Sequence, residues 1–123
     1  MIRNTLLVGI GGFAGSILRY VISYLMTTPG AHYMPWGTLT VNVSGSLLIG
    51  IFLAIAGSGN WYFLLIAGFC GGFTTFSAFS AELFNMLKAG DAERAAVYIA
   101  ASVLICVAAV WAGMMIGQRI KLT

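Results

Sequence analysis

Polar and aromatic side chains recur at helical intervals inside long apolar stretches of this chain. Residues three or four apart share one face of a helix, so each set would form a narrow hydrogen-bonding stripe. Aligned hydroxyl and amide groups either bond neighbouring helices together or line a path for a polar solute. Three aligned stripes in so short a chain favour the path. The stripes consist of Thr38, Asn42 and Ser46, of Thr74, Ser77 and Ser80, and of Tyr98, Ser102 and Cys106.

Asn42 is the most informative of these residues, because it is the only asparagine well inside an apolar stretch. Its amide offers N–H donors and an oxygen acceptor without a charge. Uncharged donors can replace the water around an anion without trapping it. Acidic residues are absent from the middle of the first, second and fourth apolar stretches, whereas a cation carrier or proton-coupled carrier usually needs a central carboxylate. Glu82, near the end of the third stretch, is expected to reach the membrane interface or to cap a cavity.

The segment GFCGGFTTFSAFS, residues 68–80, combines adjacent glycines, hydroxyls and phenylalanines within the third apolar stretch. Gly71-Gly72 predicts a break in the helix. Carbonyls freed by a break at membrane depth are tolerated beside a polar cavity, and such oxygens suit a small hard cation. Phe76 and Phe79 share a face, and the positive edges of their rings can stabilise a small anion. Taken alone, the pair is more simply explained by packing.

The composition places the chain among membrane proteins. Of its 123 residues, 60% are hydrophobic and 7% are charged, whereas a soluble domain carries about 25% charged residues. The net charge of +3 is spread too thinly for a surface that binds nucleic acid. Cys70 and Cys106 lie in apolar stretches without zinc-site spacing, so we interpret both thiols as inert. His32 is interpreted as a solvated loop residue.

Four stretches are long enough to cross the hydrocarbon as helices, for which about 20 apolar residues suffice. They cover residues 5–26, 36–56, 61–87 and 95–117. The sequence therefore predicts an all-α membrane protein, with one integral domain over residues 1–123 and four transmembrane helices, the third broken at Gly71-Gly72. Glycines four residues apart permit close helix packing. Such pairs occur at the two ends of residues 11–15, 68–72 and 113–117.

The distribution of Lys and Arg gives no clear orientation in the membrane, where cationic residues favour the cytoplasmic side. The side that holds both termini carries Arg3, Arg119 and Lys121, and the opposite side carries Lys88 and Arg94. Arg19 is expected to extend its long side chain to that second side, which makes the counts equal. A balanced count predicts insertion in both orientations.

The sequence resembles the bacterial fluoride channel family, the CrcB or Fluc proteins, over nearly its whole length. The resemblance is carried by GGFAGSILRY at residues 11–20, GTLTVNVSGSLLIG at 37–50 and GFCGGFTTFSAFSAE at 68–82. It implies a non-enzymatic, dual-topology homodimer of two antiparallel subunits in the bacterial inner membrane. It further implies two narrow pores, lined by both subunits, for passive fluoride efflux.

The resemblance also implies roles for individual residues. The family's pore asparagine and phenylalanine pair map onto Asn42, Phe76 and Phe79. Its structural Na⁺ would bind the backbone carbonyls of Gly71 and Thr74. The polar track of the pore would include Thr38, Thr75, Ser77, Ser80, Tyr98 and Ser102.

Two charged residues match family positions as structural or gating candidates, namely Arg19 in the first helix and Glu82 directly after the signature segment. Ala78 and Cys106 depart from the hydroxyl residues expected at their positions.

Two other classes of protein are compatible with parts of this pattern. A small multidrug-type, proton-coupled exporter also has four short helices and dual insertion, but its coupling needs a carboxylate, typically in the first span, and the first span here has none. A non-transporting subunit of a membrane assembly would not need three polar stripes.

Overall fold

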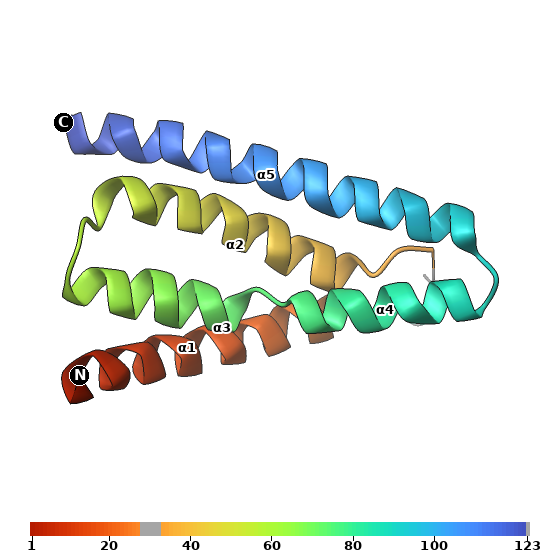
Figure 1. Ribbon diagram of the computed structural model, residues 1–123, viewed down its shortest axis with the longest axis horizontal. Helices are drawn as coiled ribbons and strands as arrows, with labels where there is room; N and C mark the ends of the chain where they lie inside the picture. The colour runs from red at the N-terminus through yellow and green to blue at the C-terminus, as the bar shows by residue number, and fades with distance from the viewer. Residues whose placement is uncertain (28–32, 123) are drawn as a thin grey trace.

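Long apolar helices account for nearly all of the chain in the computed structural model, which describes residues 1–27 and 33–122 (Figure 1). The first two are α1 (Ile2–Met26) and α2 (Trp36–Ile55), and the last is α5 (Ala92–Leu122). The third span runs from Tyr62 to Lys88 and is divided into η1 (Tyr62–Cys70), α3 (Gly71–Phe73) and α4 (Phe76–Lys88). Within the described residues these four spans, of 25, 20, 27 and 31 residues, are long and apolar enough to cross a membrane. The all-α, four-span prediction is confirmed.

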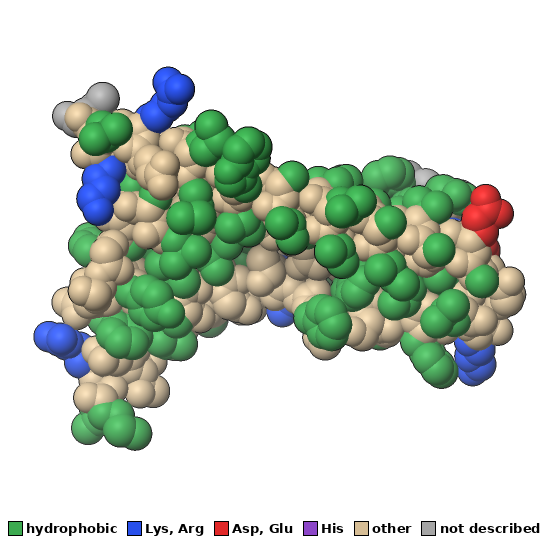
Figure 2. All heavy atoms as spheres, turned by 45° about the horizontal axis from the view of Figure 1, so that its top comes forward, with side chains coloured by type: hydrophobic (Ala, Val, Ile, Leu, Met, Phe, Trp, Pro, Cys, Tyr) green, Lys and Arg blue, Asp and Glu red, His purple; other side chains and the backbone are tan. Residues whose placement is uncertain are grey.

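The helices lie side by side as an elongated bundle (Figure 1). Both termini and the α2–η1 connection lie at one end, and the α4–α5 connection lies at the other. The helix α5 packs along α2, and α1 packs along η1 and α3. Hydrophobic side chains cover the length of the face in Figure 2, while charged side chains gather mainly at the two ends. Such a surface suits a bilayer, because the apolar band meets lipid and the charges reach water.

Glycines let α1 approach the third span with backbone against backbone. A Cβ on Gly15 would collide with the carbonyl oxygen of Phe69 and lie 2.9 Å from the amide nitrogen of Phe73. From the other side, a Cβ on Gly72 would lie 2.5 Å from the carbonyl oxygen of Gly12. The glycine pairs at 11–15 and 68–72 therefore pack against each other within one chain. The pair at 113–117 meets α2 in the same manner, since a Cβ on Gly113 would collide with the carbonyl oxygen of Leu47.

The turn between α4 and α5 follows standard capping rules. Gly90, with a φ of +80°, takes the left-handed conformation that ends many helices. Asp91 then caps α5, because its Oδ1 accepts a hydrogen bond of 3.1 Å from the amide of Arg94. This short turn fixes the pairing of α4 with α5.

The helix break differs from the sequence-based expectation. The prediction of a break at Gly71-Gly72 is wrong, because both glycines are helical and α3 continues to Phe73. The chain is extended at Thr74 (φ −85°, ψ 157°) and Thr75 (φ −148°, ψ 115°). A glycine costs a helix only about 1 kcal/mol, so two of them do not end it. Gly72 serves close packing instead.

We predict that Gly15→Ala destabilises the protein by about 1–3 kcal/mol, the usual cost of overpacking. The added methyl group would meet backbone atoms of the third span, which cannot move aside as a side chain can. The measurement is the midpoint of thermal unfolding in detergent. Gly9→Ala is the matched control on α1, since nothing lies within 4 Å of its Cβ position. Equal midpoints for the two variants would contradict the packing argument.

A candidate ion pathway beside the helix break

The side chain of Asn42 on α2 holds the extended break in place. Its Nδ2 donates to the carbonyl oxygen of Thr75 at 3.0 Å, and its Oδ1 accepts from the amide of Thr75 at 2.7 Å. Both backbone groups of Thr75 would lack partners in a dry bundle without this amide, and an unpaired buried group costs about 1–3 kcal/mol. Asn42 thus stabilises a non-helical residue in the middle of a membrane span.

The same contacts free two carbonyl groups at the break. In an unbroken helix the amide of Thr75 would bond the carbonyl of Gly71, and the amide of Ala78 would bond that of Thr74. Here the first amide donates to Asn42, and the second donates to Thr75 Oγ1 at 3.2 Å. The oxygens of Gly71 and Thr74 therefore receive neither of their helical donors. Cys70 differs, because its carbonyl oxygen accepts from both the amide and the hydroxyl of Thr74, at 3.0 and 2.8 Å.

Arg19 also points at the break. Its Nε donates to the carbonyl oxygen of Gly72 at 3.0 Å, and the side chain is half-buried. The expectation that Arg19 reaches out to the membrane surface is therefore wrong, because a carbonyl of the third span provides a nearer partner. Without Arg19, the count of Lys and Arg at the two ends becomes three against two rather than equal.

A groove of about 400 Å³ opens between α2, the break and α5. It brings together five of the predicted pore residues, namely Asn42, Thr75, Phe76, Phe79 and Ser102, and adds Thr74. The other lining residues are Gly45, Ser46, Ile49, Val103, Cys106 and Val107. Polar donors thus face a mostly apolar wall at mid-depth of the bundle.

Two hydroxyls in this groove are available to a ligand. Ser46 on α2 and Ser102 on α5 line it, and neither side-chain hydroxyl makes a hydrogen bond to another of the described residues. The Nδ2 group of Asn42 has a second N–H beyond the one given to Thr75. The groove therefore offers several neutral donors.

Gly45 is a lining residue that the sequence-based interpretation missed. A Cβ there would collide with the side-chain methyl group of Thr74 and lie 3.1 Å from the ring of Phe73. Gly45 thus makes room for the break against α2. Its position three residues after Asn42, on the same face, was the available signal.

Three aromatic rings lead away from the groove toward the α4–α5 end. The ring centroids of Phe76 and Phe79 lie 5.6 Å apart, and those of Phe79 and Tyr98 lie 4.9 Å apart. Their planes are tilted by 43° and 51°, so neither pair is stacked face to face. Phe76 is 78% exposed on this chain, whereas Tyr98 is fully buried.

Thr38, Glu82 and Tyr98 form a separate polar cluster beyond Phe79. Thr38 Oγ1 donates to Glu82 Oε1 at 2.6 Å, and the Tyr98 hydroxyl donates to Glu82 Oε2 at 2.7 Å. None of the three lines the groove. The predicted polar stripes are therefore divided between the groove and this second cluster. The hydroxyls of Thr38 and Tyr98 already donate hydrogen bonds to the Glu82 carboxylate inside the bundle.

Ser77 and Ser80 do not line the groove either. The hydroxyl of Ser77 lies 3.2 Å from that of Thr75, and Ser80 Oγ donates to the carbonyl oxygen of Phe76 at 2.9 Å. Their place in a pore stays a prediction. His32 lies outside the described residues.

The fold and the site define a small four-span membrane protein with a broken helix, whose neutral donors and aromatic rings line a groove at mid-depth. A profile described as CrcB-like protein, Camphor Resistance (CrcB), matches residues 6–114. The chain belongs to this CrcB-like family.

Similar proteins cover almost the whole chain. It is 45% identical to the fluoride-specific ion channel FluC of Coxiella burnetii, over 95% of this chain and 99% of that protein. It is 44% identical to FluC of Leptospira interrogans, over 91% and 92% of the two chains. It is 45% identical to FluC of Rhizobium etli, over 92% of this chain and 94% of that protein.

We predict that Asn42→Asp destabilises the protein by about 1–3 kcal/mol. The substitution removes the Nδ2 donor and turns a carboxylate oxygen toward the carbonyl of Thr75. The measurement is again the unfolding midpoint in detergent. Ser44→Ala is the control on the same helix, since its hydroxyl bonds only the carbonyls of Thr40 and Val41. An Asn42→Asp protein that unfolds at the wild-type midpoint would show that the break does not need the amide.

Proposed function

We propose that this protein is a fluoride-selective channel that lets fluoride leave the cytoplasm passively across the bacterial inner membrane. The observation that carries the proposal is the groove at the break, where neutral donors and aromatic rings converge without a carboxylate among the lining residues. Relatives 44–45% identical to the chain bear the name fluoride-specific ion channel.

Fluoride is small and strongly hydrated, so the loss of its water is the main cost of entering a narrow path. Conduction requires binding that is favourable enough for entry and weak enough for exit, spread over several sites. The hydroxyls of Ser46 and Ser102 and the free N–H of Asn42 are suitable donors of this kind. Chloride is larger and accepts hydrogen bonds less strongly, so closely spaced donors disfavour it.

The complete pore is proposed to need a second, antiparallel copy of the chain. One chain alone leaves the ring of Phe76 78% exposed and the groove open along its side. It also leaves Ser77 exposed at the break, with the neighbouring hydroxyl of Thr75 as its hydrogen-bond partner. A second copy that covers this face would close two equivalent grooves into two pores.

A structural Na⁺ is proposed to bind the free carbonyls at the break. The residues fit such an ion, because the oxygens of Gly71 and Thr74 have lost their helical donors and hard cations prefer oxygen ligands. Nothing lies within 4 Å of a Cβ on Gly71, so this part of the break is accessible. Two copies of the chain would provide four carbonyls. The ion would supply a fixed positive charge and hold the two copies together.

The multidrug-type exporter is less well supported. The chain has three acidic residues, and two of them, Asp91 and Glu93, belong to the α4–α5 turn and the first turn of α5. The third, Glu82, already accepts hydrogen bonds from Thr38 and Tyr98. The first span offers no carboxylate for proton coupling.

We predict that purified protein in liposomes releases fluoride and retains chloride, as measured with ion-selective electrodes. Phe76→Ile and Phe79→Ile should each lower fluoride efflux by about tenfold or more, because an aliphatic side chain has no positive edge. Phe84→Ile is the matched control on α4, because this ring is 64% exposed on this chain and does not line the groove. Equal release of both halides by the wild-type protein, or of neither, would overturn the proposed function.

We predict that fluoride efflux depends on Na⁺. Replacement of Na⁺ on both sides by N-methylglucamine at the same ionic strength should lower the efflux rate, and the return of Na⁺ should restore it. The fraction of dimer after dilution in detergent, measured by size-exclusion chromatography, should fall in parallel. Full efflux and unchanged assembly in Na⁺-free buffer would contradict the proposed role of the carbonyls of Gly71 and Thr74.

A further inference from the structure

A polar cluster lies nearly two helical turns before the α4–α5 end of the bundle, because Glu82 and Tyr98 are each six residues from Lys88 and Ala92, the adjoining ends of α4 and α5. This cluster joins α2, α4 and α5 through the hydrogen bonds of Thr38 and Tyr98 to Glu82. On α4, Met86 lies four residues beyond Glu82, and on α5, Ala95 lies three residues beyond Tyr98 toward the end of the bundle. Met34 lies four residues before Thr38, just ahead of α2. Each polar residue is therefore followed outward by an apolar one.

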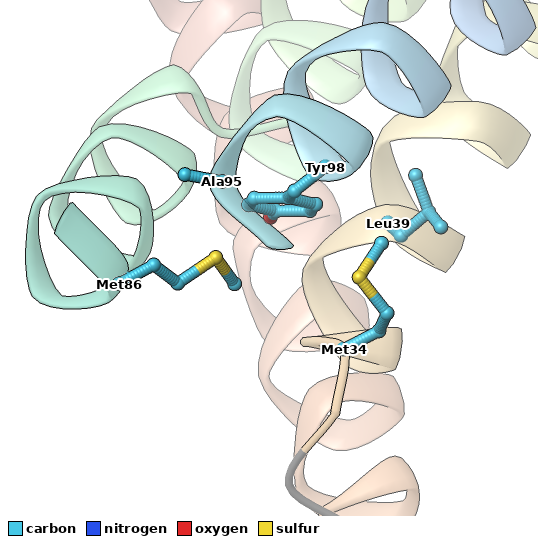
Figure 3. Close-up of a cluster of buried hydrophobic side chains, with 5 residues drawn as sticks. All are labelled: Met34, Leu39, Met86, Ala95 and Tyr98. Carbon is cyan, nitrogen blue, oxygen red and sulfur yellow. The ribbon is translucent and has the colours of Figure 1, made fainter. Parts of the chain in front are cut away.

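These apolar residues form one buried cluster (Figure 3). Met34 and Met86 are 7% and 5% exposed, and the other members are Leu39, Ala95 and Tyr98. Phe79 and Leu83 pack against the cluster from α4. In Figure 3 the side chain of Met86 extends from α4 into the space beneath the Tyr98 ring, and Met34 extends toward Leu39 on the other side. Side chains from three parts of the chain thus cover this end of the polar cluster.

We propose that Met34 and Met86 form a hydrophobic constriction that closes the fluoride path at its α4–α5 end. This inference rests on the proposed channel function. A ring of apolar side chains excludes water and so opposes the passage of a hydrated ion, which is how hydrophobic constrictions gate. Methionine suits a constriction that opens briefly, because its unbranched side chain has three rotatable bonds.

The constriction also explains how the hydrogen bonds of Glu82 persist so near the end of the bundle. Water at this position would compete with Thr38 and Tyr98 for the carboxylate oxygens. Both donors are shielded, since Thr38 is 7% exposed and Tyr98 is fully buried. An ion that leaves by this end must pass both the carboxylate and the two thioethers.

The test measures the initial rate of fluoride efflux from liposomes with Met34→Ala, Met86→Ala and the double variant. Shorter side chains admit water to the constriction, so each single variant should raise the rate by about threefold or more and the double variant further. Met114→Ala is the matched control, because this methionine is on α5 and 36% exposed. Its rate should equal that of the wild type.

A reversible chemical variant tests the constriction within one folded sample. Met86→Cys, in a Cys106→Ala background, should raise efflux as Met86→Ala does. Methyl methanethiosulfonate then transfers a methylthio group to the thiolate and releases methanesulfinate, which rebuilds a side chain of methionine length. Efflux should return to the rate of the Cys106→Ala parent, and a reducing agent should raise it again.

The outcomes separate this inference from the proposed function. No fluoride efflux from the wild-type protein would overturn the channel itself. Normal wild-type efflux, with unchanged or lower rates in the assembled alanine variants and no reversible response of Met86→Cys, would show that the cluster is only packing and that fluoride leaves elsewhere.

Discussion

The hydrogen bonds between the Asn42 amide and the backbone of Thr75 are the interaction on which the site depends. A transmembrane segment normally satisfies all its backbone groups internally, because lipid offers no partners. Asn42 removes that requirement at one residue by supplying a donor and an acceptor from α2. The third span can then stop being helical at Thr74 and Thr75 and start again at Phe76. The groove, the free carbonyls and the placement of both phenylalanines follow from this replacement of helical backbone hydrogen bonds by bonds to the Asn42 side chain.

The surrounding helices are arranged so that the break fits. Gly45 leaves room for Thr74 on the α2 side, and Gly72 lets α1 contact the third span just before the break. Arg19 then reaches the carbonyl of Gly72 from α1. A cationic side chain at membrane depth therefore has a backbone partner within the bundle.

The sequence was sufficient for the architecture and for much of the site. Apolar length predicts the four spans, and the four-residue spacing of Asn42 and Ser46 places them on one face of the groove. Three features could not be predicted from apolar length or from residue spacing within one helix. The position of the break depends on the bond between Asn42 and Thr75, which are 33 residues apart in sequence. The orientation of Arg19 depends on Gly72, 53 residues away, and the bond between Thr38 and Glu82 spans 44 residues. Periodicity describes one helix at a time and does not contain such pairings.

The interruption of the third span has an electrostatic consequence at mid-depth. Aligned peptide dipoles give a helix about half a positive charge at its N-terminus and half a negative charge at its C-terminus. An intact span would present these partial charges only at the two membrane surfaces, where water screens them. The carboxyl end at Phe73 and the amino end at Phe76 instead meet inside the bundle. One discontinuity in the chain thereby offers a negative pole to a cation and a positive pole to an anion within a few residues of each other.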